Sequence, residues 1–244
     1  LNKSNPPFYK WFEDGVTNTC YNALDIHIDQ GNGKRTALIY DSPITGNKDK
    51  FTYEELRIKV SKFAGALVNQ GVDKGDRVII YMPMIPEAVI AMLACARIGA
   101  IHSVVFGGFA SNELASRIDD SKAKILITAS CGFEPGRTVE YKPLVDEAVK
   151  QANHKIQKMI LFQRNGHDVK LNAPKEISWD EALSNAKETD CTEMNSNEFA
   201  YILYTSGTTG TPKGIVRDIG GHIVALKWTM KNIYNIDEGD IWWS

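Results

Sequence analysis

The chain has 244 residues, 43% of them hydrophobic and 24% charged, which is ordinary for a globular protein and enough to bury a substantial core. Its formal net charge of −2 gives no electrostatic reason to expect nucleic acid or an anionic membrane as a partner. The longest apolar run, residues 88–100, contains Arg97 and is too short to cross a bilayer, so we expect no membrane association.

From residue 35 onward, predicted strands alternate with predicted helices. The first half of the pattern comprises a strand over 35–41, a helix over 51–71, a strand over 76–83, a helix over 86–99, a strand over 100–106, a helix over 111–121 and a strand over 123–128. The second half comprises a helix over 141–152, a strand over 158–162, a short helix from residue 178, a strand over 198–205, an extended segment over 213–218 and a helix over 220–234. This alternation predicts an α/β fold with a mostly parallel sheet flanked by helices, in which ligands bind where the strands end.

The first of these helices carries clear signals at both ends. Thr52 is the predicted N-cap, and Glu55 three residues later completes a capping box. Gly71 suits the position just past the last turn, because glycine adopts positive φ at low cost. The apolar stripe between these signals consists of Leu56, Val60, Phe63 and Leu67.

Capping signals mark three later helices as well. Pro86 opens the second helix in its first turn, and Gly99 closes it. We expect Ser111 to be the N-cap of the third helix. Ser178 and Glu181 have the spacing of a capping box before the short helix.

The stretch "YTSGTTGTPKG" (204–214) follows a predicted strand. Its glycines permit close backbone approach, so several amide groups can converge on one anion, and hydroxyl groups and a lysine add further donors. The sequence therefore predicts a cradle for a polyphosphate, formed by Thr205, Ser206, Thr208, Thr209 and Lys213. The alternative is a polar surface loop without a ligand.

The spacing of this loop excludes two common motifs. A Walker A motif needs G-x-x-x-x-G-K followed by Ser or Thr, whereas here Pro212 precedes Lys213 and Gly214 follows it. The G-x-S-x-G elbow of hydrolases needs a glycine two residues before the serine, where Tyr204 stands.

The cysteines and histidines show no metal-binding pattern. Cys20, Cys95, Cys131 and Cys191 include no C-x-x-C pair, and the five histidines show no H-E-x-x-H spacing. We therefore expect no metal site, and free thiols in a reducing compartment.

The first residues lack a signal-peptide pattern, and the chain does not begin with methionine. We expect a protein of the cytoplasm or the mitochondrial matrix that is not secreted.

The stretch "YTSGTTGTPKG" resembles the signature phosphate loop of the adenylate-forming (AMP-binding) enzymes, the acyl-CoA synthetase superfamily. Three further blocks, 11–28, 104–132 and 239–244, resemble the short-chain acyl-CoA synthetases that make acetyl- or propionyl-CoA. The blocks "CGFEPGRTVEYKPLVDEA" and "KGIVRDIGGHIVALKW" are closer to the propionyl type. The resemblance covers essentially all 244 residues.

This resemblance implies an ATP-dependent ligase that uses Mg²⁺. A short-chain carboxylate attacks the α-phosphate of ATP to give acyl-AMP and pyrophosphate, and the thiol of coenzyme A then displaces AMP. Lys213 would be the catalytic residue, because its ammonium group would neutralise part of the pyrophosphate charge. The loop residues implied to hold the ATP phosphates are Thr205, Ser206, Gly207, Thr208, Thr209, Gly210 and Lys213.

The resemblance also implies that "FGGF" (106–109) receives the nucleotide end of coenzyme A. Phe106 would offer an aromatic face to adenine, while Gly107 and Gly108 would let the ligand approach closely. The alternative for Phe106 is packing in the core at the end of a strand.

A second segment, "EPGR", is implied to bind the 3′-phosphate of coenzyme A; it comprises Glu134, Pro135, Gly136 and Arg137. Arg137 is the natural phosphate ligand. Acetyl-type relatives carry another arginine where Glu134 stands, and a carboxylate repels a phosphate. Either Glu134 points away, therefore, or Arg137 alone makes that contact.

Residues after the loop have less specific interpretations. Arg217 and Asp218 would form a local ion pair, or Arg217 would lie near the phosphates. We expect His222 to be a packing or capping residue. Trp242 and Trp243 would be core aromatic residues or neighbours of an acyl pocket.

The resemblance places residues 1–244 in the first part of the large N-terminal domain of an adenylate-forming enzyme, with 1–34 as the N-terminal extension of the short-chain synthetases. The C-terminal domain would be absent, and the acyl pocket, adenine site and adenylation lysine would lie beyond residue 244. We therefore expect this chain alone to be inactive. An adenylating enzyme with another acyl acceptor and a non-enzymatic nucleotide-binding module remain alternatives. The sequence determines neither the exact acid nor the oligomeric state.

Overall fold

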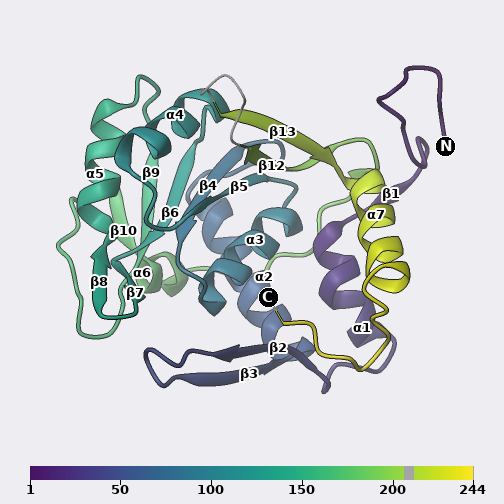
Figure 1. Cartoon of the computed structure of the whole chain (residues 1–244), viewed down its shortest axis with the longest axis horizontal. Helices are drawn as coiled ribbons and strands as arrows, with labels where there is room; N and C mark the ends of the chain where they lie inside the picture. Colours follow the sequence, from purple (N-terminus) through teal and green to yellow (C-terminus); the bar gives the residue numbers. More distant parts are fainter. Residues whose placement is uncertain (206–211, 244) are drawn as a thin grey trace.

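A seven-stranded sheet forms the centre of the part of the chain that the structure describes, residues 1–205 and 212–243 of a computed structural model (Figure 1). Its order is β10-β9-β6-β4-β5-β12-β13. The strands are β4 (Arg77–Met82), β5 (Ile101–Phe106), β6 (Ile125–Ala129), β9 (Lys158–Phe162), β10 (Glu176–Ser178), β12 (Phe199–Thr205) and β13 (Lys213–Asp218). All neighbours are parallel except β12 and β13, which confirms the predicted mostly parallel sheet.

Helices cover both faces of this sheet (Figure 1). They are α2 (Tyr53–Asn69), α3 (Pro86–Arg97), α4 (Ser111–Ser121), α5 (Tyr141–Gln151), α6 (Trp179–Ser184) and α7 (Ile219–Asn232). α2 packs against α3 and α6, whereas α4 packs against α5. The chain moves in opposite directions along the sheet from β4 to β5 and from β5 to β6, so right-handed crossovers place α3 and α4 on opposite faces.

The predicted ends of α2 are confirmed. The Glu55 backbone N–H donates to Thr52 Oγ1 at 3.2 Å, and the Thr52 N–H donates to Glu55 Oε2 at 2.8 Å. Gly71 follows the helix with φ of +82°. The predicted apolar stripe is buried, and its members are Leu56, Val60, Phe63 and Leu67. Sequence-local signals therefore determined this helix.

The other capping predictions had mixed outcomes. α3 begins at Pro86, and Gly99 follows it with φ of +72°, as expected. Ser178 is confirmed as the N-cap of α6, since its Oγ accepts the N–H of Glu181 at 3.0 Å. The prediction that Ser111 caps α4 was wrong. The helix already includes Ser111, because the backbone carbonyl of Ala110 accepts the first helical N–H groups.

The strand predicted over 35–41 forms, but outside the central sheet. It is β2 (Thr36–Asp41), which pairs antiparallel with β3 (Lys48–Thr52) in a separate hairpin at the bottom of Figure 1. Strand propensity gave no information on which partner β2 would take.

The sequence pattern also missed several short elements. These are β1 (Val16–Thr17), a π-helical turn η1 (Tyr21–Asp25), α1 (Ile26–Asp29), β7 (Cys131–Glu134), β8 (Arg137–Glu140) and β11 (Met194–Asn195). β7 and β8 form an antiparallel hairpin, and β1 pairs with β11 across most of the chain length. Each is too short for a recognisable period of hydrophobic residues.

The core lies where the central strands meet α2, α3 and α6. Every residue of β6 is buried, and the rings of Phe63 and Trp179 stack at 3.7 Å between α2 and α6. Within the described part of the chain, no helix combines the length and apolar character that a membrane crossing needs.

Candidate active site

The predicted site residues lie where parallel strands end. β4 ends at Met82 and β5 at Phe106, and these two residues are partners in the strand ladder. β12, which is parallel to β5, ends at Thr205. Because parallel strands all end at one edge, the "FGGF" segment and the start of the phosphate loop share that edge of the sheet.

The phosphate loop connects two antiparallel neighbours, β12 and β13. Thr205 is paired with Lys213 in their register, and both residues are exposed. The loop therefore leaves and re-enters the sheet at adjacent positions. Five of the predicted phosphate-binding residues lie outside the described residues, namely Ser206, Gly207, Thr208, Thr209 and Gly210. Lys213 was expected to be a loop residue; in the structure it is the first residue of β13.

Tyr204 anchors the base of the loop to α4. Its hydroxyl donates to Asp120 Oδ2 at 2.6 Å. Partial burial and the neighbouring Asp120 carboxylate raise the pKa of Tyr204, so the phenol keeps its proton and remains a donor. The end of β12 is thus fixed to a helix on the face of the sheet.

Arg117 joins the loop to the "FGGF" segment. Its guanidinium carbon lies 5.2 Å from the ring centroid of Phe109 and 5.4 Å from that of Tyr204. The side chain is buried and donates to the backbone carbonyl of Glu113 at 2.6 Å and to its carboxylate at 2.8 Å. The sequence analysis missed Arg117. Its one signal was an arginine four residues after Glu113 on the predicted helix, which usually marks a solvent-exposed pair.

Phe106 is 68% exposed at the end of β5, so the alternative of core packing for this residue was wrong. The rings of Phe106 and Phe109 lie 5.6 Å apart and tilted. An exposed aromatic face at the carboxyl edge of a parallel sheet is available to stack on a planar ligand.

The two glycines after Phe106 are required by close packing and by backbone conformation. A Cβ on Gly107 would lie 2.3 Å from the Tyr141 hydroxyl oxygen. Gly108 has φ of +101°, and its N–H donates to the Tyr81 hydroxyl oxygen at 3.0 Å. The same hydroxyl donates to the Phe109 carbonyl at 2.9 Å. Two tyrosines therefore hold this turn in place.

The "EPGR" segment is the turn of the β7–β8 hairpin. Arg137 Nε donates to Glu134 Oε2 at 2.7 Å, and the Arg137 side chain is 70% exposed. The Glu134 carboxylate thus pairs with Arg137 itself, and both possibilities for Glu134 stay predictions. Gly136 has φ of +77°, as the tight turn requires.

The structure brings the two predicted coenzyme A segments together. A Cβ on Gly108 would lie 3.8 Å from Glu134 Oε1. Gly132 of β7 contacts the Tyr141 hydroxyl as Gly107 does, since a Cβ on either would lie 2.3 Å from it. Burial raises the pKa of Tyr141 to about 12. This neutral phenol packs between both segments and positions them.

The expectations for the residues after the loop had mixed outcomes. Asp218 is the N-cap of α7 and accepts the Gly221 N–H at 2.8 Å, and no ion pair joins it to Arg217 within the described residues. His222 packs edge-on against Tyr201, which agrees with a packing role. Trp242 and Trp243 are 48% and 91% exposed, so core packing is wrong for both.

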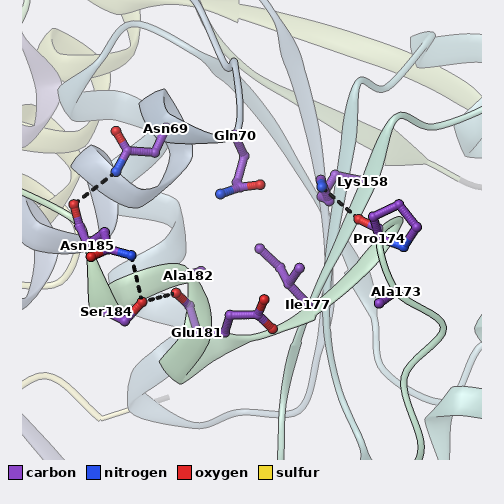
Figure 2. A pocket seen from close by; sticks show the side chains of 10 residues that line it. All are labelled: Asn69, Gln70, Lys158, Ala173, Pro174, Ile177, Glu181, Ala182, Ser184 and Asn185. Carbon is purple, nitrogen blue, oxygen red and sulfur yellow. Dashed lines mark hydrogen bonds between the residues drawn. The ribbon is translucent and has the colours of Figure 1, made fainter.

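Two cavities elsewhere contain none of the predicted site residues. The first, of 370 Å³, lies between the end of α2, α6 and the start of β9, and Figure 2 shows its lining. Asn69 there donates to the Asn185 carbonyl at 3.2 Å, and Lys158 to the Pro174 carbonyl at 2.7 Å. Lys158 is the first residue of β9, so this cavity is at the amino edge of the sheet. The second, of 420 Å³, lies between the β7–β8 hairpin and the loop around Gly166.

Comparison with known proteins identifies the family of the chain. Residues 27–244 match the family described as AMP-binding enzyme, and residues 1–23 match the family described as acetyl-coenzyme A synthetase N-terminus. A solved structure, an acetoacetyl-CoA synthetase from Streptomyces lividans, superposes with a TM-score of 0.81 at 26% identity over 92% of this chain and 34% of its own.

Curated relatives narrow the family further. The chain is 53% identical over its whole length to acyl-CoA synthetase short-chain family member 3, mitochondrial, of Homo sapiens, and 46% identical to an acetyl-coenzyme A synthetase of Streptomyces coelicolor. It spans 36% of the length of the first and 37% of the second. These relatives and the match of residues 1–23 confirm the resemblance to short-chain acyl-CoA synthetases, and the chain belongs to the AMP-binding enzyme family.

Proposed function

We propose that the complete protein activates a short-chain carboxylate, propionate or acetate, with ATP to give acyl-AMP and then transfers the acyl group to coenzyme A. The observation that carries this proposal is the continuous family match over residues 27–244, preceded by the match to the acetyl-CoA synthetase N-terminus. The arrangement of the described site residues at one edge of the sheet supports it.

In the first half-reaction, a carboxylate oxygen of the acid attacks the α-phosphorus of ATP, and the bond to the pyrophosphate oxygen breaks. Negative charge develops on the leaving group. The amides and hydroxyls of the 205–210 loop would stabilise it, with the Lys213 ammonium group as the fixed positive charge. Pairing of Lys213 with Thr205 supports this role, because it places the lysine beside the first hydroxyl of the loop.

Mg²⁺ would enter with the triphosphate. The described residues near the loop offer few ligands to this ion, since the Asp120 carboxylate already accepts a hydrogen bond from the Tyr204 hydroxyl. Among the described residues, the one group of three potential metal ligands is Cys20, Asp25 and Cys191, on other elements. We therefore derive no step from a protein-held ion and assign Mg²⁺ to the nucleotide phosphates.

In the second half-reaction, the coenzyme A thiol attacks the acyl carbon of acyl-AMP and AMP leaves. We propose that the exposed ring of Phe106 stacks on the adenine of coenzyme A, with Gly107 and Gly108 allowing close approach. Arg137 would bind the 3′-phosphate after partial release from Glu134. That exposed ion pair is weak, so a doubly charged phosphate can compete with it.

We assign residues 1–34 to the N-terminal extension of the short-chain synthetases and the rest of the chain to the first part of their large domain. The 244 residues span only 36% of the length of the human relative. We therefore expect them alone to catalyse neither half-reaction. The human relative is named mitochondrial and the Streptomyces relative is bacterial, so the proposed location is mitochondrial or cytoplasmic.

The test is ATP–pyrophosphate exchange by the full-length protein with acids of two to four carbons. We expect exchange that depends on the acid, and a Lys213→Ala variant that is slower by about 10²–10³-fold. Lys62→Ala is the matched control, because Lys62 is an exposed residue of α2 and belongs to none of the predicted site segments. Full activity of Lys213→Ala would contradict the assigned role.

Acceptor specificity separates the remaining alternatives. Formation of acyl-CoA on addition of coenzyme A supports the complete proposal. Exchange without acyl-CoA would point to a different acyl acceptor, such as a carrier protein. Nucleotide binding without exchange would point to a non-enzymatic module.

A further inference from the structure

Four residues outside the candidate active site form a polar cluster: the buried Cys20 and Arg97, and the partly buried Asp25 and Cys191. Cys20 directly precedes η1 and Asp25 ends it, Arg97 is the last residue of α3, and Cys191 lies in the segment between α6 and β11. In Figure 1, α1, which continues η1, is at the lower right, and α4 of the candidate site is at the top left. The cluster therefore shares no residue or element with the predicted phosphate loop and coenzyme A segments.

Arg97 is the charged centre of this cluster. Its side chain is 2% exposed, and its two terminal nitrogens donate to the Asp25 carboxylate at 2.8 and 2.9 Å. One of these nitrogens also contacts the Cys20 sulfur at 3.5 Å. Cys20 is completely buried. A buried thiol in contact with a guanidinium is an unusual environment, because it favours the thiolate form.

The second thiol of the cluster lies within reach of the first. The sulfur atoms of Cys20 and Cys191 and a carboxylate oxygen of Asp25 all lie within 4.8 Å of one another. The Cys191 thiol also contacts Asp25 Oδ2 at 3.7 Å and is partly exposed. Small solutes can therefore approach the pair from the side of Cys191.

The two thiols differ in acidity. A hydrogen bond from Cys191 and the contact with Arg97 hold the pKa of Cys20 below its ordinary value, although burial opposes them. The pKa of Cys191 is raised, first by its hydrogen bond to Cys20 and then by burial. The Arg97 guanidinium, 3.5 Å from the Cys20 sulfur, favours the same assignment of Cys20 as the thiolate and Cys191 as its thiol partner.

Hydrogen bonds to backbone carbonyls hold together the three segments that carry the cluster. The Asn18 side-chain amide donates to the carbonyls of Arg97 at 3.1 Å and Thr192 at 2.9 Å. The Thr192 N–H donates to the Arg97 carbonyl at 2.8 Å, and Arg97 Nε donates to the Thr189 carbonyl at 2.5 Å. Cys191 lies between Thr189 and Thr192, so these hydrogen bonds hold its segment in place beside Cys20.

We propose that Cys20 and Cys191 are a redox-active pair, which a peroxide converts into a disulfide that ties the N-terminal helix to the segment before β11. The Cys20 thiolate attacks one oxygen of hydrogen peroxide. The O–O bond breaks, Cys20 becomes a sulfenic acid, and the released hydroxide takes a proton and leaves as water. Cys191, losing its proton, then attacks the sulfenic sulfur; the S–O bond breaks, and a second water leaves with that proton. Two thiols are oxidised, and one peroxide is reduced to two waters.

A metal ion is a poorer occupant of the same cluster. Cys20, Asp25 and Cys191 could supply three ligands, but the Arg97 guanidinium already contacts two of them. A divalent cation would have to displace or neutralise this buried positive charge. Arg97 favours an anionic sulfur without a metal.

The other two cysteines are suitable internal references. Cys95 is completely buried, and burial raises the pKa of its thiol. Cys131 is also buried, and burial raises its pKa too. Both should stay protonated and react slowly with peroxide.

The test is treatment of the full-length protein with hydrogen peroxide, followed by alkylation and peptide mass mapping. We expect a peptide pair joined between Cys20 and Cys191, with loss of two hydrogen atoms, that dithiothreitol separates again. Cys95 and Cys131 should remain available for alkylation after unfolding. Oxidation of Cys95 and Cys131 as fast as the pair, or no joined peptide, would contradict the proposal.

Single substitutions sharpen the result. Cys191→Ser should abolish the joined peptide and let a sulfenic acid accumulate on Cys20, where dimedone captures it. Cys131→Ser is the matched control and should leave the joined peptide unchanged. Dimedone labelling of Cys191 in Cys20→Ser at the same rate would overturn the assignment of the nucleophile. None of these readouts uses synthetase activity, so the proposal stands or fails independently of the proposed function.

Discussion

The centre of the sheet and its β12–β13 edge have similar apolar strands but very different burial. In β6, Ile125, Leu126 and Ile127 are all 0% exposed. In β13, Ile215 and Val216 are 40% and 45% exposed. A strand sequence therefore does not decide how much of it is buried; the neighbours on both sides and both faces decide that.

The two regions meet between β5 and β12. His102 pairs with Tyr201 in the strand ladder, and their rings stack at 5.6 Å. Tyr201 in turn contacts His222 on α7. This small aromatic cluster, together with the tie from Tyr204 to α4, connects the edge to the rest of the sheet.

The largest effect is expected from Ile127→Ala in the sheet centre. Ile127 lies between Ile80 of β4 and Ile160 of β9, and all three are 0% exposed. Removing its side-chain methyl groups leaves a cavity that rigid neighbours cannot fill, so we expect a loss of about 3–4 kcal/mol of unfolding free energy. Urea unfolding followed by far-ultraviolet circular dichroism measures it. A loss below about 1 kcal/mol would show that the centre is not tightly packed.

Acid should weaken the junction between the two regions. Burial lowers the pKa of His102 to about 4, and no partner is found for its Nδ1 among the described residues. The unfolded chain protonates this histidine near its ordinary pKa of about 6.5, so stability falls as the pH drops from there toward 4. We expect a loss of about 3 kcal/mol over this range. His222, whose pKa burial also lowers, adds in the same direction.

His102→Gln is the control for the acid effect. Unfolding free energies of both proteins at several pH values between about 7 and 4 should show a shallower slope for the variant. An unchanged slope would mean that other groups cause the acid sensitivity.

A smaller effect is expected from Tyr204→Phe, which removes the donor to Asp120 and keeps the ring over Arg117. Loss of one partly exposed hydrogen bond should cost about 1 kcal/mol of unfolding free energy. If this bond positions the loop, ATP–pyrophosphate exchange by the full-length protein should fall as well. Tyr40→Phe is the control, since Tyr40 lies in the separate β2–β3 hairpin.

The smallest effect is expected from Ile215→Ala at the edge. The residue is 40% exposed, so truncation removes few contacts and leaves no enclosed cavity. We expect a loss below about 1 kcal/mol, measured with the same urea series as Ile127→Ala. Equal losses at both positions would remove the distinction between centre and edge.

Sequence-based prediction succeeded where the signal is local. The capping box at Thr52 and the stripe through Phe63 specify α2 without reference to any other part of the chain. The antiparallel partner of β2, the β7–β8 hairpin and the pairing of β1 with β11 could not be predicted this way. These strands are short, and what determines the partner of each is either a contact between residues distant in sequence or the turn that joins the two strands.

The candidate site shows the same division. The composition of the loop indicated Thr205 and Lys213, and the resemblance implied Phe106 and Arg137. The motifs could not indicate Arg117, because its role depends on two rings that come from β12 and from the turn after β5. Nor could they show that Glu134 binds Arg137 in the hairpin turn.

By itself the sequence determined the alternation of strands and helices, and its motifs carried the resemblance that indicated the family. The alternation follows from hydrophobic periodicity and capping residues, which act over a few residues. Tertiary structure alone decided which strands are buried, which side chains join the two predicted segments, and that Cys20 meets Cys191 beside Arg97. Those outcomes depend on packing and electrostatic contacts between residues up to 171 positions apart, which no local pattern encodes.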